Sequence, residues 1–411
     1  ADGSVVTWGD ADGGGNSSAV GPLLIEGVFQ VCGSRRAFAA IKADGSVVTW
    51  GDGRVGGNSS AVAPLLTGDN VHVCGNVVTW GDGRGGGNSS DVAPLLTGGV
   101  VQVCGNPYAF AAIKADGSVV TWGIDHGGGD SSAVAPLLTG GVVQVCGNTH
   151  AFAAIKADGS VVTWGDDHGG GDSSAVARLL KGGVVQVLSN SNAFAAIKAD
   201  GSIVTWGDGR GGGDSSAVAP LLTGGVVQVF SNANAFAAIK EDGSVVTWGD
   251  ADGGGNSSAV APLLTGGVVQ VCGNPFAFAA IKEDGSVVTW GNDRGGGNSS
   301  AVALFLTECV VQVCGNTYAF AAIKADGSVV TWGDGRGGGD SSAVARLLTG
   351  GVVQVFSNSN AFAAIKADGS VVTWGDSNGG GNSSDVAPLL SAVRQEMDCV
   401  RLRSRSDRDL T

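Results

Sequence analysis

Basic side chains are scarce in this sequence. The 411 residues include 23 Lys and Arg against 37 Asp and Glu, which gives a formal net charge of -14 at pH 7. Nucleic-acid binding needs basic surface to neutralise phosphates. The composition therefore predicts no nucleic-acid partner and favours a neutral or basic protein partner.

Long apolar runs are also missing. No run of about 18 apolar residues occurs, and residues 1–30 contain no basic segment followed by an apolar core. The sequence therefore predicts neither a membrane span nor a signal peptide. The compartment stays open, with the cytoplasm or nucleus favoured.

Paired cysteines at metal-binding spacing are absent, because no Cys-x-x-Cys occurs. Six of the eight cysteines share one position of an internal repeat: Cys32, Cys74, Cys104, Cys146, Cys272 and Cys314. The same position holds Leu188, Phe230 and Phe356, which indicates an apolar core position. We therefore predict no metal site and no disulfide framework. Cys309 and Cys399 lie outside the pattern.

The repeat itself is marked by tryptophan. Successive tryptophans are 42 residues apart, with one gap of 30: Trp8, Trp50, Trp80, Trp122, Trp164, Trp206, Trp248, Trp290, Trp332 and Trp374. A fixed period of this size indicates units that bury their apolar surface against their neighbours. With Gly at 73 positions, short strands joined by tight turns are favoured, so the predicted class is all-β.

Three strands are predicted in each repeat. In the repeat that opens at Val100, the first strand spans 100–104, with residues 100, 102 and 104 on one face and 101 and 103 on the other. The second spans 109–114 and is apolar on both faces, which predicts packing between neighbouring sheets. A hairpin turn at Asp116 and Gly117 leads to the third strand, 118–122.

One or two helical turns are predicted after the Gly-rich loop. Asp130 or Ser131 would cap a short segment through Val134 and Leu137, and Gly140 would stop it.

The repeats also predict the organisation of the chain. Residues 1–99 contain a half repeat, a full repeat and a repeat near 70–80 that has lost 12 residues. Residues 100–390 form seven intact repeats, and 391–411 form a charged tail that we expect to be helical at first and disordered later.

The pattern G-V-V-Q-V-x-x-N-x-x-A-F-A-A-I-K-x-D-G-S-V-V-T-W-G resembles the repeats of the regulator of chromosome condensation family over nearly all of residues 1–390. The unit is most similar to the short blades of the bacterial propeller-type β-lactamase inhibitory protein, and it also resembles the propeller regions of HERC-type ubiquitin ligases. The resemblance implies a β-propeller of three-stranded, or four-stranded, blades, with an open β superhelix as the alternative. The His that often precedes the second strand in this family is Ala109 here, and the family's G-Q-L-G is reduced to Gly127–Gly129.

Catalysis is not predicted. The four histidines are His72, His126, His150 and His168, and no Ser-His-Asp set can be built from repeated positions without ten copies of it. We expect no enzyme activity, no cofactor and no metal. The loop Asp10–Asn16 is similar to a calcium loop, but most repeats place Arg or His where a ligand would be needed.

Two other repeated features have simple structural interpretations. Aspartate replaces the asparagine of the Asn-Ser-Ser sequon in four repeats, which favours backbone capping over glycosylation. The lysines that end the second strand are interpreted as a solvated row paired with the hairpin aspartates, or as one side of a binding face.

The leading function hypothesis is a monomeric, non-enzymatic scaffold that presents variable loops to a protein partner. The resemblance extends this to the recognition part of a HERC-like ubiquitin ligase, and the alternatives are guanine-nucleotide exchange on a small GTPase and enzyme inhibition. The candidate binding residues lie in the loops that vary between repeats: Tyr108, Asp125, His126, Asp167, His168, Arg210, Phe276, Arg294, Tyr318 and Arg336.

Overall fold

The computed structural model describes most of the chain, namely residues 3–33, 36–44, 46–60, 66, 79, 81–82, 86–387 and 390. The predicted truncated repeat near 70–80 and the predicted tail at 391–411 lie almost wholly outside these residues, as does Cys399. The described residues belong to two compact units, unit 1 with residues 1–58 and 299–411 and unit 2 with residues 59–298. The boundaries predicted after residues 99 and 390 stay predictions.

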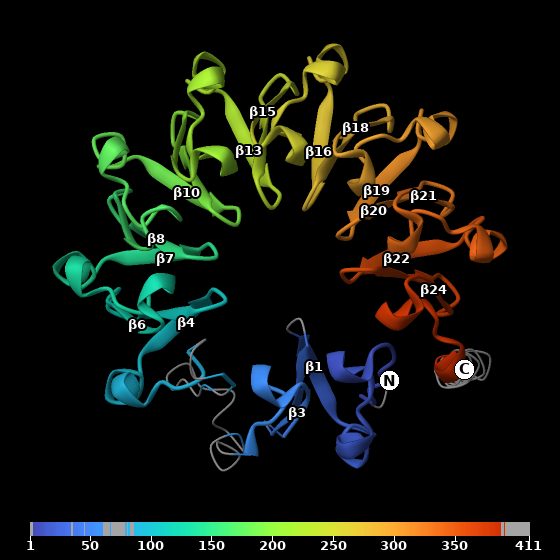
Figure 1. Ribbon diagram of the computed structural model, residues 1–411, viewed down its shortest axis with the longest axis horizontal. Helices are drawn as coiled ribbons and strands as arrows, with labels where there is room; N and C mark the ends of the chain where they lie inside the picture. Colours follow the sequence, from blue (N-terminus) through green and yellow to red (C-terminus); the bar gives the residue numbers. More distant parts are fainter. Residues whose placement is uncertain are drawn as a thin grey trace, which may run out of the picture. The chain divides into compact units, whose positions relative to one another are not determined.

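The described residues form eight three-stranded antiparallel sheets, each with its strands in chain order (Figure 1). The strands of unit 2 are β4 (Val100–Gly105), β5 (Ala109–Lys114), β6 (Val119–Gly123), β7 (Val142–Gly147), β8 (Ala151–Lys156), β9 (Val161–Gly165), β10 (Val184–Ser189), β11 (Ala193–Lys198), β12 (Ile203–Gly207), β13 (Val226–Ser231), β14 (Ala235–Lys240), β15 (Val245–Gly249), β16 (Val268–Asn274), β17 (Ala277–Lys282) and β18 (Val287–Gly291). Those of unit 1 are β1 (Val28–Gly33), β2 (Ala37–Lys42), β3 (Val47–Gly51), β19 (Val310–Gly315), β20 (Ala319–Lys324), β21 (Val329–Gly333), β22 (Val352–Ser357), β23 (Ala361–Lys366) and β24 (Val371–Gly375).

The sheets confirm the predicted all-β architecture of tandem three-stranded blades. The second strand has the predicted bounds, the first runs one residue further, and the third begins and ends one residue later than predicted.

The predicted alternation of the first strand is wrong. In β7 the register shifts between Val142 and Gln144, which is a β-bulge. The extra residue places Val142 and Val145 in the same core, although their odd spacing would put them on opposite faces of a regular strand. Val143, which lies between these two residues in the sequence, is exposed.

Four cores of unit 2 lie between two consecutive sheets. The core between β7–β9 and β10–β12 is formed by Ala151, Ala153, Ile155, Leu180, Val184, Val187, Phe194, Ala196, Val204 and Trp206. In unit 2 the alanines of the second strands are fully buried, and their small side chains let the sheets approach closely. The prediction that each sheet packs between copies of itself is confirmed within unit 2.

A tryptophan and a glycine join each blade to the one before it. Trp206 stacks on Phe194 with ring centroids 5.2 Å apart, and its indole Nε1 donates to the carbonyl oxygen of Gly170 at 3.1 Å. Gly170 has a φ of +93°, and a Cβ there would lie 2.9 Å from Cδ2 of Phe194. Only glycine meets both the backbone and the packing requirement at this position.

The same contact joins the N-terminal half repeat to the last described repeat in unit 1. Trp8 Nε1 donates to the carbonyl oxygen of Gly380 at 3.0 Å, as Trp374 does to Gly338. The N-terminal half repeat therefore takes the place of the repeat that would follow Trp374.

Short helical segments connect the blades. They are η1 (Ala11–Gly15), η2 (Ser18–Leu23), η3 (Gly53–Val55), η7 (Ser90–Leu95), η8 (Asp125–Gly127), η9 (Ser132–Leu137), η10 (Ser174–Val176), η11 (Gly209–Gly213), η12 (Ser216–Leu221), η13 (Ala251–Gly255), η14 (Ser258–Leu263), η15 (Asp293–Gly295), η16 (Ser300–Phe305), η17 (Gly335–Gly337), η18 (Ser342–Leu347), η19 (Ser377–Gly381) and η20 (Ser384–Val386).

The predicted helical turn is present as η9, a 3-10 helix. Its flanking aspartate acts as predicted, because Asp130 Oδ1 accepts a hydrogen bond from the N–H of Ser132 at 2.8 Å. Asn256 makes the same bond to Ser258 in a repeat with a sequon, so the capping interpretation covers both residue types. The side chain of Ser131 makes no capping bond, and the helix runs through Val134 to Leu137, as predicted.

Among the described residues, no helix is both long enough and apolar enough to cross a membrane.

Candidate interaction surface

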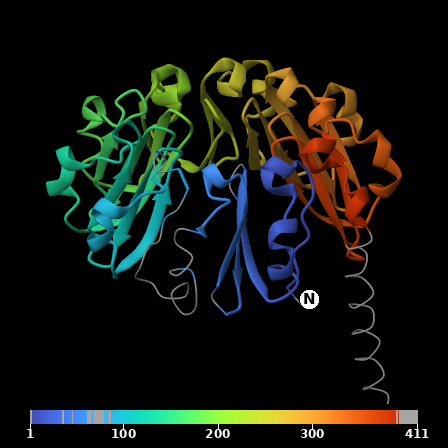
Figure 2. The same cartoon turned by 60° about the horizontal axis from the view of Figure 1, so that its bottom comes forward.

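Each blade has two ends with different loops, as the side view of β1–β3 illustrates (Figure 2). In the blade β7–β9, the antiparallel strands place residues 147–151 and 165–173 at one end, which we call the loop end. Residues 156–161 and the end of the preceding 3-10 helix lie at the other end, which we call the hairpin end. The candidate surface is built from the loop ends.

The hairpin end uses its polar side chains internally. Asp158 Oδ1 accepts hydrogen bonds from Ser160 Oγ at 2.6 Å and from its N–H at 2.9 Å, and these bonds lower the pKa of Asp158. Lys156 Nζ donates to the carbonyl oxygen of Leu137 at 3.0 Å. The lysine therefore ties the hairpin to the preceding helix, a role that the predicted row of paired surface charges did not include.

A buried asparagine shapes the loop end. Asn148 is 5% exposed, and its Nδ2 donates to the carbonyl oxygen of Gly169 at 2.6 Å. Its Oδ1 accepts from the N–H groups of His150 at 2.9 Å and Ala151 at 2.8 Å. The side chain thus clamps the loop before the second strand to the loop after the third. Equivalent clamps are made by Asn106, Asn190, Asn232, Asn274, Asn316 and Asn358.

The asparagine clamp was missed by the sequence analysis. Its signal was present, because this Asn recurs in every intact repeat although the two residues after it vary.

The predicted binding residues all lie at loop ends. In the blade β4–β6, the N–H of Ile124 donates to the carbonyl oxygen of Tyr108 at 2.9 Å, so the two variable loops meet. The side chains of Tyr108, Asp125 and His126 are exposed there. The other candidates are also exposed at the loop ends of their own blades: Asp167, His168, Arg210, Phe276, Arg294, Tyr318 and Arg336. Their role in binding stays a prediction.

Two rings from consecutive blades stack at this surface. The ring of Tyr108 lies 5.7 Å from that of His150, with 21° between the ring planes. A backbone hydrogen bond from Thr149 to the carbonyl oxygen of Ser191 at 3.2 Å ties the same loop to the following blade. His150 was left out of the candidate set, although the 42-residue period puts it in the same position as Tyr108.

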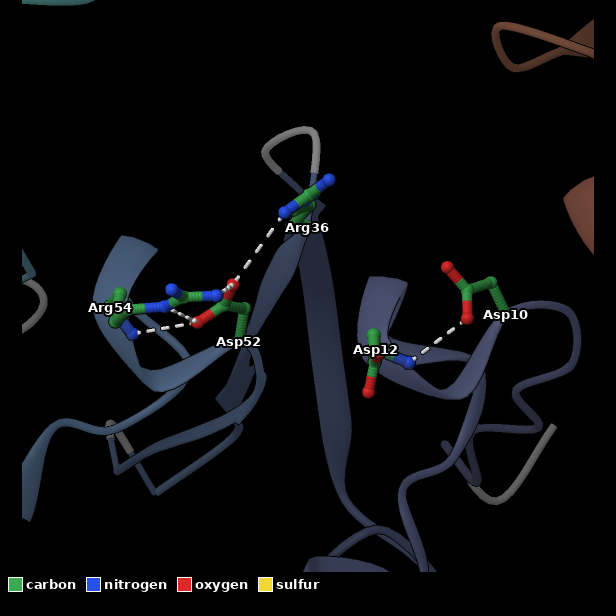
Figure 3. A network of polar contacts seen from close by, with 5 residues as sticks. All are labelled: Asp10, Asp12, Arg36, Asp52 and Arg54. Atoms are coloured by element: carbon green, nitrogen blue, oxygen red, sulfur yellow. Dashed lines mark hydrogen bonds and ion pairs between the residues drawn. The ribbon is translucent and has the colours of Figure 1, made fainter.

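Unit 1 carries an arginine–aspartate network at a loop end (Figure 3). Arg54 donates from Nε to Asp52 Oδ1 at 3.2 Å and from Nη2 to Oδ2 at 3.1 Å, and Arg36 Nη1 lies 3.9 Å from Oδ2. The hydrogen bonds from Arg54 are the main reason that the pKa of Asp52 is lowered. Both arginine side chains are more than half exposed, so the network is a polar surface feature.

In the loop that is similar to a calcium loop, the first aspartate accepts hydrogen bonds from backbone N–H groups. Asp250 Oδ1 accepts from the N–H groups of Asp252 at 2.8 Å and Gly253 at 3.2 Å, and Asp10 Oδ1 accepts from Asp12 (Figure 3). Within the part of the chain that the structure describes, no three His, Cys, Asp or Glu side chains gather in a way that could hold a metal ion.

The prediction of an apolar core position is confirmed in part: Cys104, Cys146 and Cys314 pack against cores, but Cys32 and Phe356 at the same repeat position are exposed, and Cys74 lies outside the described residues. Cys104 and Cys146 lie against the cores between blades in the position that Leu188 and Phe230 fill elsewhere. Burial raises the pKa of both thiols, which disfavours the reactive thiolate. Cys309, unexplained by the sequence, is exposed and has a φ of +64° where other repeats have glycine.

Comparisons with known proteins give a likeness in structure alone. No family model matches the chain, and no curated protein matches it. Among solved structures, the chain is similar to Prp20p from Saccharomyces cerevisiae, with 13% identity, a TM-score of 0.36 and coverage of 80% of each chain. It is also similar to human WBSCR16, with 15% identity, a TM-score of 0.35 and coverage of 64% of this chain and 88% of that one. A third similar structure is the ectodomain of the Physcomitrella patens receptor kinase CR4, with 14% identity, a TM-score of 0.35 and coverage of 72% and 70%.

These similarities are too weak to carry an argument about activity. The class of the protein follows from the blades themselves: they are tandem three-stranded antiparallel sheets built on a 42-residue repeat.

Proposed function

We propose that the chain is a non-enzymatic scaffold that binds a protein partner through the loop ends of its blades. The observation that carries the proposal is the division of labour within a blade. At the hairpin end, repeated side chains bond to their own blade or to the connection before it, whereas at the loop end a constant Asn clamp holds exposed side chains that change from repeat to repeat.

Exposed and varied side chains on a fixed frame are what a specific interface requires. Because the frame is held by buried hydrogen bonds and by packing between blades, little conformational entropy is lost when a partner docks. Tyr and Arg, which occur at these positions, are enriched among the residues that dominate binding energy.

The proposal is tested by capture of partners from a native lysate, quantified by mass spectrometry. A loop-end variant carries Tyr108→Asn, Phe276→Asn and Tyr318→Asn, each introducing the residue that Asn192, Asn234 and Asn360 already provide at this position. A hairpin-end variant carries Asp158→Asn, Asp200→Asn and Asp242→Asn. The loop-end variant should release partners that the hairpin-end variant retains. Equal capture by both variants would contradict the proposal.

A finer version is that the scaffold is the recognition part of a HERC-like ubiquitin ligase. Captured partners would then be ubiquitinated in cells, and the loop-end variant would reduce that modification. If partners bind through the loop ends but are not ubiquitinated, the scaffold function is supported and the ligase version is contradicted.

A further inference from the structure

The loop ends of β4–β6 and β7–β9 share an unusual combination of side chains. They present the stacked rings of Tyr108 and His150, and Tyr108 is 39% exposed. Their loops, residues 105–109, 123–131, 147–151 and 165–173, contain five aspartates and no lysine or arginine. Rings and carboxylates therefore occur together without a cation from the same loops.

Other loop ends that carry a ring also carry a cation. Phe276 is followed 18 residues later by Arg294, and Tyr318 is followed at the same spacing by Arg336. The residues at that spacing from Tyr108 and His150 are His126 and His168. The guanidinium that accompanies the ring elsewhere is therefore missing from these two blades.

Not all the carboxylates are equally available to a partner. Asp166 Oδ1 accepts from the N–H groups of His168 and Gly169, and Asp130 accepts from Ser132. Asp125 and Asp167 occupy the next position of the loop and are exposed. These two carboxylates are the ones that we assign to recognition.

We propose that Tyr108, His150, Asp125 and Asp167 form a site for an arginine side chain in a basic segment of the protein partner. A guanidinium stacks on aromatic faces and pairs with carboxylates in two parallel hydrogen bonds, whereas a lysine ammonium is a compact, strongly hydrated point charge. The net charge of -14 also favours approach of a basic segment. The inference rests on the proposed function, because it names the chemistry of the partner at part of the same surface.

The experiment measures fluorescence anisotropy of the full chain with labelled peptides of alternating Arg and Gly, or Lys and Gly, at physiological salt. The arginine peptide should bind about 3- to 10-fold more tightly than the lysine peptide, because only arginine stacks well. The variant Tyr108→Asn/His150→Asn should lose most of this preference, and Asp125→Asn/Asp167→Asn should weaken both peptides.

The matched control is Asn192→Ala/Asn234→Ala, which changes the same position in the next two blades and should leave binding unchanged. Thermal melts verify that the variants fold. We expect Tyr108→Asn/His150→Asn to fold, because Asn already occupies this position in the next two blades. Equal binding of the two peptides, or a preference that survives Tyr108→Asn/His150→Asn, would overturn the inference. If such a peptide result coincides with loss of native partners from the loop-end variant, the scaffold function stands and only the arginine site falls.

Discussion

The hairpin end and the loop end of a blade use similar polar residues for different purposes. At the hairpin end, Asp158 and Lys156 bond to Ser160 and to the carbonyl oxygen of Leu137. At the loop end, Asn148 and Asp166 are committed in this way, whereas the residue two positions after the asparagine is exposed or half-buried and changes from blade to blade. Residues that recur in every repeat therefore hold the blades together, and residues that vary at the loop ends form the candidate interface.

The largest expected effect is on the glycine that joins two blades. Gly254 has a φ of +93°, and a Cβ there would lie 2.9 Å from Cδ2 of Phe278. Backbone strain and overpacking together should make Gly254→Ala cost about 3 kcal/mol in the free energy of unfolding. Urea unfolding measures the change. A cost below that of Gly267→Ala, where a Cβ meets nothing nearer than Lys282 Cε at 3.6 Å, would contradict the assigned role.

The next effect compares two asparagines in one loop, of which one holds the blade together and the other lies at the candidate interface. Asn232 is 9% exposed, and its side chain bonds to Gly253 and to the N–H of Ala235. Its replacement by Ala leaves buried polar groups unpaired, so Asn232→Ala should cost about 2 to 3 kcal/mol. Asn234→Ala, two residues on, should change the free energy of unfolding by less than about 0.5 kcal/mol. Equal costs by urea unfolding would break the comparison.

A smaller effect is expected where the hairpin end departs from its own pattern. Cys309 has a φ of +64°, whereas Gly267 has +73° at the same position of another repeat. An L-residue in this region costs roughly 1 to 2 kcal/mol, so Cys309→Gly should stabilise the protein by about 1 kcal/mol. The converse change, Gly267→Ala, should destabilise it by a similar amount. Thermal melts that show no gain for Cys309→Gly would argue against strain at this residue.

The smallest effect is the pH dependence of the hairpin end. Hydrogen bonds from serine lower the pKa of Asp158, Asp200 and Asp242 in the folded state. Their contribution to stability is therefore complete above the pKa of the unfolded chain and is lost as the pH falls through the folded value, below about pH 4. The hairpin-end variant with three Asp→Asn changes should lose less stability than the parent between neutral pH and pH ~3. An equal fall in melting temperature for the parent and the variant over this pH range would contradict the assignment.

Local patterns predicted most of the blade, because they follow from residues close in sequence. The bounds of β5, the Asp116–Gly117 turn and the helical turn near Ser132 depend on period and turn chemistry alone. The bulge in β7 was not predicted, because it depends on how Val142 and Val145 fit the neighbouring sheet.

Contacts between repeats were harder to predict. The stacking of Tyr108 on His150 and the bond from Trp8 to Gly380 join residues 42 and 372 positions apart. The repeat period alone implies the first of these contacts. The second also requires that the N-terminal half repeat lie beside the last described repeat, which is a property of the fold and not of any local stretch.

The central claim is that the loop ends recognise the partner and the hairpin ends hold the blades. A photo-reactive phenylalanine analogue placed at His150, or at Asp158 of the same blade, tests this claim most directly by cross-linking in native lysate. We predict partner cross-links from position 150 and none above background from position 158. Cross-links of equal strength from both positions, or from position 158 alone, would contradict the account.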